Sequence, residues 1–217
     1  MKAASKPMIA LALFFVAAAR GDVLDQSQSL VDTNTGPNAI GGSSDQELAQ
    51  VVTAGLSGSL TAVGLPVAGS GTLLVQIEGV SGGIPNGTVL TSQTVAGSSL
   101  PDFATDPTGF RFLELSQPVN FLAGDLYAIV LSALSPPSDS FGLLNGPLGN
   151  PYPGGDAVFS GLINPGTWYP LGNGRFDLPF ESFVMPAPEP SASVFWGLTG
   201  LVIAMLRAAT QKSKRKS

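Results

Sequence analysis

Two stretches of this chain decide its fold: Phe110-Arg111-Phe112-Leu113-Glu114-Leu115 and Leu126-Tyr127-Ala128-Ile129-Val130-Leu131-Ser132. Apolar residues alternate with charged ones in the first stretch, and the second is almost wholly apolar. Both patterns are typical of strands, and we expect each strand to be buried on one face against a second sheet. The turn Leu122-Ala123-Gly124-Asp125 lies between them.

Outward from this centre, short apolar runs alternate with Gly, Pro, Ser and Asn, and none keeps a helical period beyond two turns. This pattern predicts an all-β fold, a single jelly-roll-like β-sandwich over residues 45–185 with nine to eleven strands. A tight turn is predicted at Asn86-Gly87 and a loose, polar N-terminal arm at 20–44. The other strands are predicted at 47–53, 59–67, 72–78, 88–95, 141–144, 156–160, 168–171 and 176–185.

The N-terminus has the pattern of a signal peptide over residues 1–19. Lys2 and Lys6 precede an apolar run at 8–16, and Ala17-Ala18-Ala19 supplies a small-residue cleavage site. The mature chain is therefore predicted to begin near Arg20, with an uncleaved N-terminal anchor as the alternative. In either case, residues 20–187 are expected outside the cytoplasm.

The C-terminus, residues 186–217, has three parts in a fixed order: Pro188-Glu189-Pro190, an uncharged apolar run at 191–206, and a basic tail at 211–216. Residues 191–209 would form a helix of about 28 Å, close to the thickness of a hydrocarbon core. The basic tail predicts that the C-terminal end stays in the cytoplasm. We therefore expect a transmembrane helix here.

These three parts together resemble the PEP-CTERM sorting signal of Gram-negative bacteria. The resemblance implies that Pro188, Glu189 and Pro190 are recognised by exosortase, a membrane-embedded, protease-like enzyme that cuts nearby. It further implies an inner-membrane precursor that moves to the cell surface or the extracellular matrix, often alongside exopolysaccharide export. The alternative is an ordinary C-terminal membrane anchor that is never cut.

Three patterns in the body of the chain resemble the choice-of-anchor domains of bacteria, most nearly the R type. The resemblance implies a small extracellular β-sandwich without enzymatic activity and with no known ligand. The patterns lie at 83–90, 115–132 and 150–157, the last with Trp168 beyond it.

Charge and composition exclude several functions. Between Asp22 and Met185, fourteen acidic residues face only Arg111 and Arg175, a net charge of −12 that would repel nucleic acid. The chain has no cysteine and no histidine, which removes disulfides, thiol nucleophiles, Ser-His-Asp catalysis and imidazole metal ligands. These absences exclude most hydrolase mechanisms. Together with the resemblance to choice-of-anchor domains, they lead us to expect a protein that is not an enzyme and needs no cofactor.

Acidic loop residues leave two alternatives open. A carboxylate glycosidase would need two acids facing each other across a cleft, and the candidate pairs are Asp102 with Asp106 and Asp156 with Asp177. These residues lie in Gly- and Pro-rich loops, where Asp favours turns by bonding its own backbone. Calcium is the other use of such oxygen-rich loops, although no EF-hand spacing is present.

Aromatic residues in the last third of the chain suggest a third function. Tyr152, Trp168 and Tyr169 are interleaved with asparagines, as in carbohydrate-binding modules that stack sugar rings on exposed aromatic faces. The competing interpretation, which we prefer, places the same side chains in the core or at its rim. A binding module for exopolysaccharide requires that they face solvent.

Overall fold

The computed structural model describes residues 21–106, 109–161 and 163–187. The predicted signal peptide, the Pro188-Glu189-Pro190 motif, the transmembrane segment and the basic tail lie outside these residues. In the described part the fold is all-β and sandwich-like, as predicted, with three short 3-10 helices at Gly42–Ser44, Gly97–Ser99 and Leu171–Asn173. No helix of the described residues has the length and apolarity that crossing a membrane requires.

Thirteen strands make up the described fold, two more than the upper limit predicted from the sequence. They are β1 (Val23–Gln28), β2 (Asn38–Gly41), β3 (Glu47–Thr53), β4 (Gly58–Leu65), β5 (Val67–Ser70), β6 (Thr72–Ser81), β7 (Ile84–Ala96), β8 (Arg111–Phe121), β9 (Leu126–Ala133), β10 (Ser140–Leu143), β11 (Ala157–Ser160), β12 (Tyr169–Pro170) and β13 (Phe180–Pro186).

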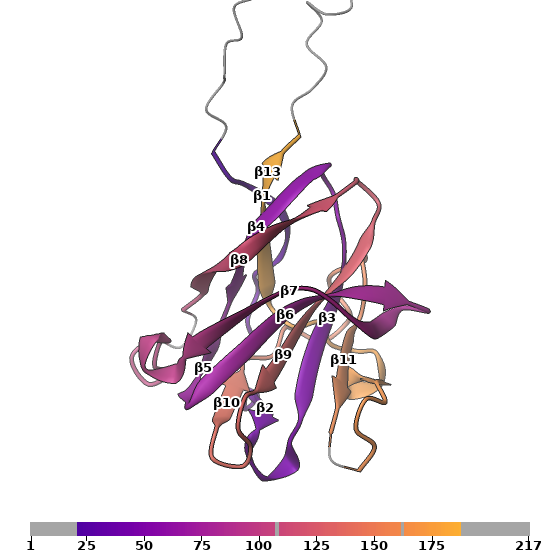
Figure 1. Cartoon of the computed structure of the whole chain (residues 1–217). Coiled ribbons are helices and arrows are strands. Elements are labelled where there is room, and N and C mark those ends of the chain that lie inside the picture. The colour runs from indigo at the N-terminus through magenta and orange to yellow at the C-terminus, as the bar shows by residue number, and fades with distance from the viewer. Residues whose placement is uncertain (1–20, 107–108, 162, 188–217) are drawn as a thin grey trace, which may run out of the picture.

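The strands form three antiparallel sheets. The largest has the order β12-β11-β3-β9-β6-β7, a second has the order β1-β13-β4-β8, and a small third sheet has the order β2-β10-β5. β1 and β13 pair with each other, so the described chain begins and ends at the same end of the molecule (Figure 1).

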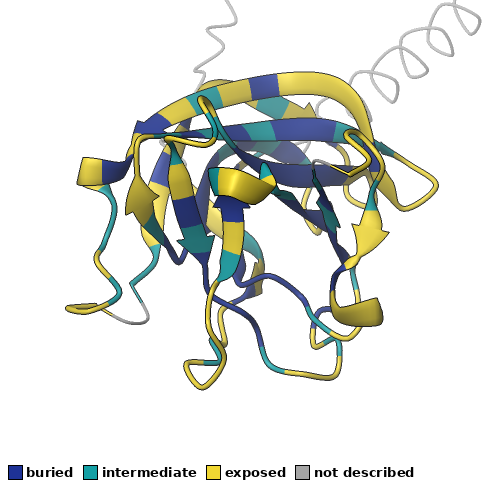
Figure 2. Ribbon diagram, turned by 90° about the horizontal axis from the view of Figure 1, so that it is seen from below, coloured by how far each residue is buried: buried dark blue, intermediate teal, exposed yellow. Residues whose placement is uncertain are grey.

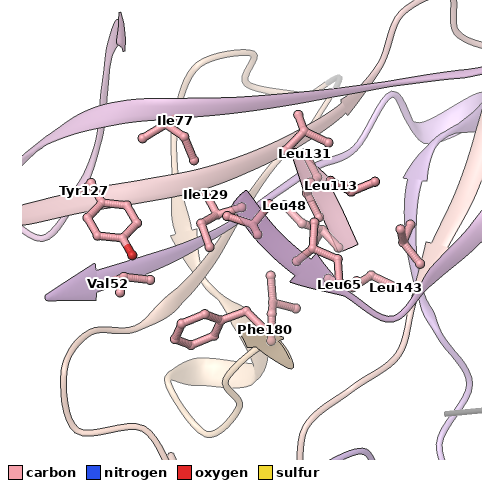
Figure 3. Close-up of a cluster of buried hydrophobic side chains, with 14 of the residues drawn as sticks. Leu48, Val52, Leu65, Ile77, Leu113, Tyr127, Ile129, Leu131, Leu143 and Phe180 are labelled. Carbon is pink, nitrogen blue, oxygen red and sulfur yellow. The ribbon is translucent and has the colours of Figure 1, made fainter. Parts of the chain in front are cut away.

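The main core lies between the sheets. Leu48, Ile77 and Ile129 from the six-stranded sheet face Leu113 and Phe180 from the four-stranded sheet (Figure 3). The small sheet adds Ile40, Phe141 and Leu143 to the same cluster. Exposed residues gather on the loops and outer edges, as Figure 2 shows, which is the distribution that apolar burial produces.

The two stretches that predict the fold belong to different sheets. β8 pairs with β4 and shows the expected alternation, with Leu113 and Leu115 buried. β9 pairs with β3 and β6 and is buried on both faces, which corrects the prediction of a single buried face. The second face is covered because a small cluster of Ala49, Val51, Ala128, Val130 and Val158 packs against Val80 and Trp168.

The hairpin turn between β6 and β7 is not at Asn86-Gly87. Ser81 pairs with Ile84, so Gly82 and Gly83 are the two turn residues, and both have positive φ, 63° and 82°. Two consecutive positive φ angles suit the tightest hairpins, and a Gly-Gly pair adopts them without steric cost. The strand β7 therefore begins four residues earlier than predicted.

The segment predicted as a loose arm, residues 20–44, is ordered into strands over its described part. β1 pairs with β13 through five residue pairs, and β2 pairs with β10 through four. Ile40 of β2 is fully buried in the main core. The polar composition of the segment is misleading because an edge strand needs only one buried face, so few apolar residues suffice to hold it.

Candidate ligand pocket

The predicted sorting motif lies directly beyond the last described residue. β13 ends at Pro186, and the amide of Ala187 donates a hydrogen bond of 2.9 Å to the carbonyl oxygen of Ser57. Pro188, Glu189 and Pro190 follow in the sequence and lie outside the described residues.

Tyr152, the first of the predicted sugar-stacking residues, belongs to the main core. It is 5 % exposed, and its ring packs edge-on against Phe180 at a centroid distance of 5.0 Å. Its hydroxyl accepts a hydrogen bond of 3.2 Å from the Thr53 amide and lies 3.3 Å from the side-chain oxygen of Gln26. Burial raises the pKa of this phenol. Tyr152 therefore presents no open face to a ligand.

Trp168 and Tyr169 are neighbours in sequence but have different surroundings. Trp168 is partly buried against the outer face of the six-stranded sheet, in contact with the cluster that includes Val130 and Val158. Tyr169, in β12, is 41 % exposed. The three predicted aromatic residues do not form one solvent-facing cluster, and Tyr169 is the only one of them that is exposed.

An apolar pocket lies beside Tyr169. Phe159 of β11 pairs with Tyr169 across the strand pair, and their ring centroids are 5.8 Å apart with the planes tilted by 38°. The side-chain amide of Asn164 donates a hydrogen bond of 3.0 Å to the Tyr169 hydroxyl. The pocket has a volume of about 560 Å³ and is lined by Ser44, Gln46, Phe159, Gly161, Ile163, Asn164 and Tyr169.

Hydrogen bonds of the β11–β12 connection shape one wall of this pocket. The Ser160 hydroxyl accepts a bond of 3.1 Å from the Gly166 amide, and the Thr167 amide donates a bond of 3.0 Å to the Asn164 carbonyl oxygen. Two aromatic rings give the pocket a stacking surface. The side-chain NH2 groups of Asn164 and Gln46 donate to the Tyr169 hydroxyl and the Ala39 carbonyl oxygen, which leaves their amide oxygens as hydrogen-bond acceptors. Such a combination suits a sugar ring, which has an apolar face and polar edges.

The pocket could be recognised from the sequence only in part. Tyr169 and Asn164 are conspicuous because they lie in the aromatic, Asn-rich last third. Phe159 and Gln46 carry no such signal, since they are far apart in the sequence. They meet because β11 pairs with β3, which places Ser160 opposite Glu47.

Asp177, one of the candidate catalytic acids, is a buried structural residue. Its carboxylate accepts hydrogen bonds of 2.8 Å from the Tyr152 amide and 3.1 Å from the Gln50 side chain. Gln50 in turn accepts a bond of 2.8 Å from the Leu178 amide. Burial raises the pKa of the Asp177 carboxyl, although the two hydrogen bonds oppose the shift. The sequence gives no sign of this network, because Gln50 lies between apolar residues of β3, and Tyr152 and Asp177 are more than a hundred residues away.

The remaining acids of the candidate pairs lie in loops. Asp156 accepts a hydrogen bond of 3.0 Å from the Asn150 side chain. Asp102 accepts one of 2.9 Å from the Ala104 amide two residues on, the turn geometry that Asp favours. Across residues 21–106, 109–161 and 163–187, no group of three or more acidic side chains could hold a metal ion, and the calcium site stays a prediction.

No model of a known protein family matches the chain, and no curated protein matches it at a significant level.

Proposed function

We propose that this chain is an exported, non-enzymatic protein of the cell surface or extracellular matrix, sorted through its C-terminal Pro-Glu-Pro, transmembrane and basic signal. An exosortase-type enzyme recognises Pro188, Glu189 and Pro190 in a precursor held in the inner membrane. The mature domain then reaches the cell surface, in association with exopolysaccharide. The N-terminal signal peptide, residues 1–19, directs the export.

One observation carries this proposal: the motif, the apolar run and the basic tail follow one another in the sequence after β13, the last strand of the described domain. The order fits a signal that can be removed without disturbing a fold whose last strand ends at Pro186. The two prolines also keep the motif out of a helix, so an enzyme can bind it as an extended strand.

Further observations support the non-enzymatic role. The chain lacks histidine and cysteine, and the buried acid Asp177 is engaged in hydrogen bonds rather than presented to a cleft. The jelly-roll assignment and the kinship with choice-of-anchor domains are part of the same proposal. They are supported by the sandwich-like, all-antiparallel arrangement of the strands.

The test is Glu189→Ala in a host that possesses the sorting enzyme. Export and folding should be unchanged, but the variant should remain in the inner membrane at full length with its basic tail, as detected by mass spectrometry and cell fractionation. Glu114→Ala is the matched control because it removes an exposed Glu on β8, distant from the motif in the sequence. Identical processing and fractionation of wild type and Glu189→Ala would refute sorting and leave the plain membrane anchor.

The pocket between Phe159 and Tyr169 favours a second function, the binding of carbohydrate. Tyr169→Ala should weaken binding to exopolysaccharide purified from the host by about tenfold, equivalent to about 1.4 kcal/mol, as expected for one lost stacking contact. Phe112→Ala is the matched control, since Phe112 is a similarly exposed aromatic residue on β8. Equal loss in both variants, or no binding by the wild type in isothermal titration, would exclude this function.

A further inference from the structure

Exposed apolar side chains gather at the end of the sandwich where the described chain begins and ends. They are between 40 % and 68 % exposed. We name this group the exit rim: Val23, Leu24, Leu56, Leu122 and Met185. Scattered exposed leucines are ordinary, but several on neighbouring segments at one end of a molecule form a patch that water solvates poorly.

The exit rim is held together by hydrogen bonds between its segments. Ser57 joins two of these segments. Its carbonyl oxygen accepts a hydrogen bond of 2.9 Å from the Ala187 amide, and its hydroxyl accepts one of 3.0 Å from the Ala123 amide. The Gly55 amide donates a hydrogen bond of 3.1 Å to the Asp25 carboxylate, which joins β1 to the loop that contains Gly55 and Ser57. A shallow groove of about 320 Å³ lies among residues 57–59, 120–122 and 185–187. The patch is therefore part of the folded structure.

The length of chain beyond Ala187 limits how far this end can be from a membrane. Only residues 188–190 separate Ala187 from Ser191, the first residue of the apolar run. Even fully extended, the four steps from Ala187 to Ser191 cover at most about 14 Å. If the apolar run spans the bilayer, Ala187, which is bonded to Ser57 at the edge of the exit rim, cannot be farther than this from the point where the chain enters the bilayer.

We propose that, in the membrane-anchored precursor, the exit rim rests on the bilayer surface and inserts its aliphatic side chains among the lipid head groups. The inference depends on the proposed function only in requiring that residues 191–206 span a membrane. The rim is a patch of exposed aliphatic side chains next to a bilayer, and a lipid surface accepts such side chains without demanding a matched shape.

Negative charge weakens this contact, so it depends on the tether, by which we mean residues 188–206 that link the domain to the membrane. Asp22, Asp25 and Asp125 lie on the same segments as the rim residues, so anionic lipids repel this end of the domain and zwitterionic lipids suit it better. A few partly buried aliphatic side chains give only reversible membrane binding. Cutting the chain near Pro188-Glu189-Pro190 therefore frees the domain, whereas the uncut precursor keeps the motif close to the bilayer, within reach of a membrane-embedded enzyme.

The experiment uses the natural absence of cysteine. Full-length protein carrying Leu122→Cys, labelled with an environment-sensitive fluorophore, is reconstituted in phosphatidylcholine vesicles. The matched control is Leu134→Cys, because Leu134 is also exposed and follows the far end of β9, whereas the near end of β9, at Leu126, adjoins the turn that contains Leu122. We expect the label at 122, but not the label at 134, to emit at shorter wavelength and to be quenched by spin-labelled lipid.

A second variant distinguishes the effect of the rim side chains on the label from the effect of the tether alone. Leu24→Ser, Leu56→Ser and Met185→Ser replace exposed side chains, and circular dichroism checks that the fold is kept. Combined with the label at position 122, they should abolish the wavelength shift. A shift that persists would show that the tether alone causes the proximity, and one that appears only at high protein-to-lipid ratio would show that a second copy covers the rim. Either result overturns the proposal.

Failure of this inference differs from failure of sorting. A label at 122 that stays in water while the protein floats with the vesicles refutes the exit rim contact and leaves the sorting signal intact. Protein that does not float with the vesicles refutes the membrane segment, and with it the rim contact. Normal rim contact together with unprocessed wild type in the host refutes sorting alone.

Discussion

Four carboxyl groups show how single residues respond to burial in this acidic domain. The pKa values of Asp25, Glu47, Glu78 and Asp177 are all raised, and burial is the largest cause at each. For Glu47, repulsion from Glu78 and Asp45 adds to the shift. Arg111 and Arg175 are the only basic residues between Asp22 and Met185, so few positive charges are available to offset these effects.

These shifts predict that the domain becomes more stable as the medium becomes mildly acidic. These four carboxyl groups stay protonated to higher pH in the native state than in the unfolded chain, where the pKa values are about 3.8 for Asp and 4.5 for Glu. The free energy of unfolding should therefore be largest below those values and fall as the pH rises through the native pKa values. Urea unfolding at several pH values between about 4.5 and about 8 measures the trend.

Glu47→Gln tests the contribution of one group. The neutral amide removes the cost of burying a charge and the repulsion from Glu78, so the variant should be more stable than wild type at neutral pH and less dependent on pH. Glu114→Gln is the control because it removes one charge at an exposed position of β8. Equal pH dependence of wild type and Glu47→Gln would contradict the assignment.

At the scale of elements, the small sheet depends on a close approach between two strands. Gly69 of β5 pairs with Phe141 of β10, and its φ is 155°. A Cβ atom at position 69 would lie 2.4 Å from the Ser140 carbonyl oxygen and 2.6 Å from the Phe141 Cα. The β5–β10 pair can therefore form at this distance only with a glycine.

Gly69→Ala should accordingly cost more stability than a glycine replacement without such contacts. Gly82→Ala is the matched control, because Gly82 has a positive φ of 63° but nothing within 4 Å of the added Cβ. We expect the control to lose about 1 kcal/mol of unfolding free energy, from backbone strain alone. Gly69→Ala should lose about 2 kcal/mol or more, because strand β5 must also shift. Thermal or urea unfolding of both variants measures the difference, and equal costs would refute the close-approach argument.

At the scale of the whole molecule, the N-terminal strands complete the fold. β1 covers the edge of β13, and β2 buries Ile40 in the core. A fragment that begins at residue 45 lacks both strands and exposes unpaired edges on β13 and β10. Such edges promote aggregation.

The fragment of residues 21–187 should therefore be soluble, show a β-type circular dichroism spectrum and melt cooperatively. The fragment 45–187 should melt at lower temperature and aggregate, as measured by light scattering. This prediction replaces the boundary at residue 45 that the sequence suggests. Equal melting temperatures for the two fragments would show that residues 21–44 are indeed a dispensable arm.

The fold class and most of the strands follow from the sequence alone. β3 covers the predicted residues 47–53, and β9 matches the prediction to within one residue, because alternating or continuous apolar runs between turn residues have few other stable arrangements. Composition is likewise sufficient to exclude histidine and cysteine chemistry. The proposals about export and sorting also depend on the sequence, since the terminal segments lie outside the described residues.

Which strands meet is decided by the tertiary structure. Local pattern cannot show that β8 and β9 belong to different sheets, that the polar segment before residue 45 pairs with β13 and β10, or that Phe159 and Gln46 line one pocket. It also cannot separate buried Tyr152 from exposed Tyr169, which have similar neighbours in sequence. Strand pairing and burial are set by contacts between residues far apart in the chain, whereas periodicity reports only on near neighbours.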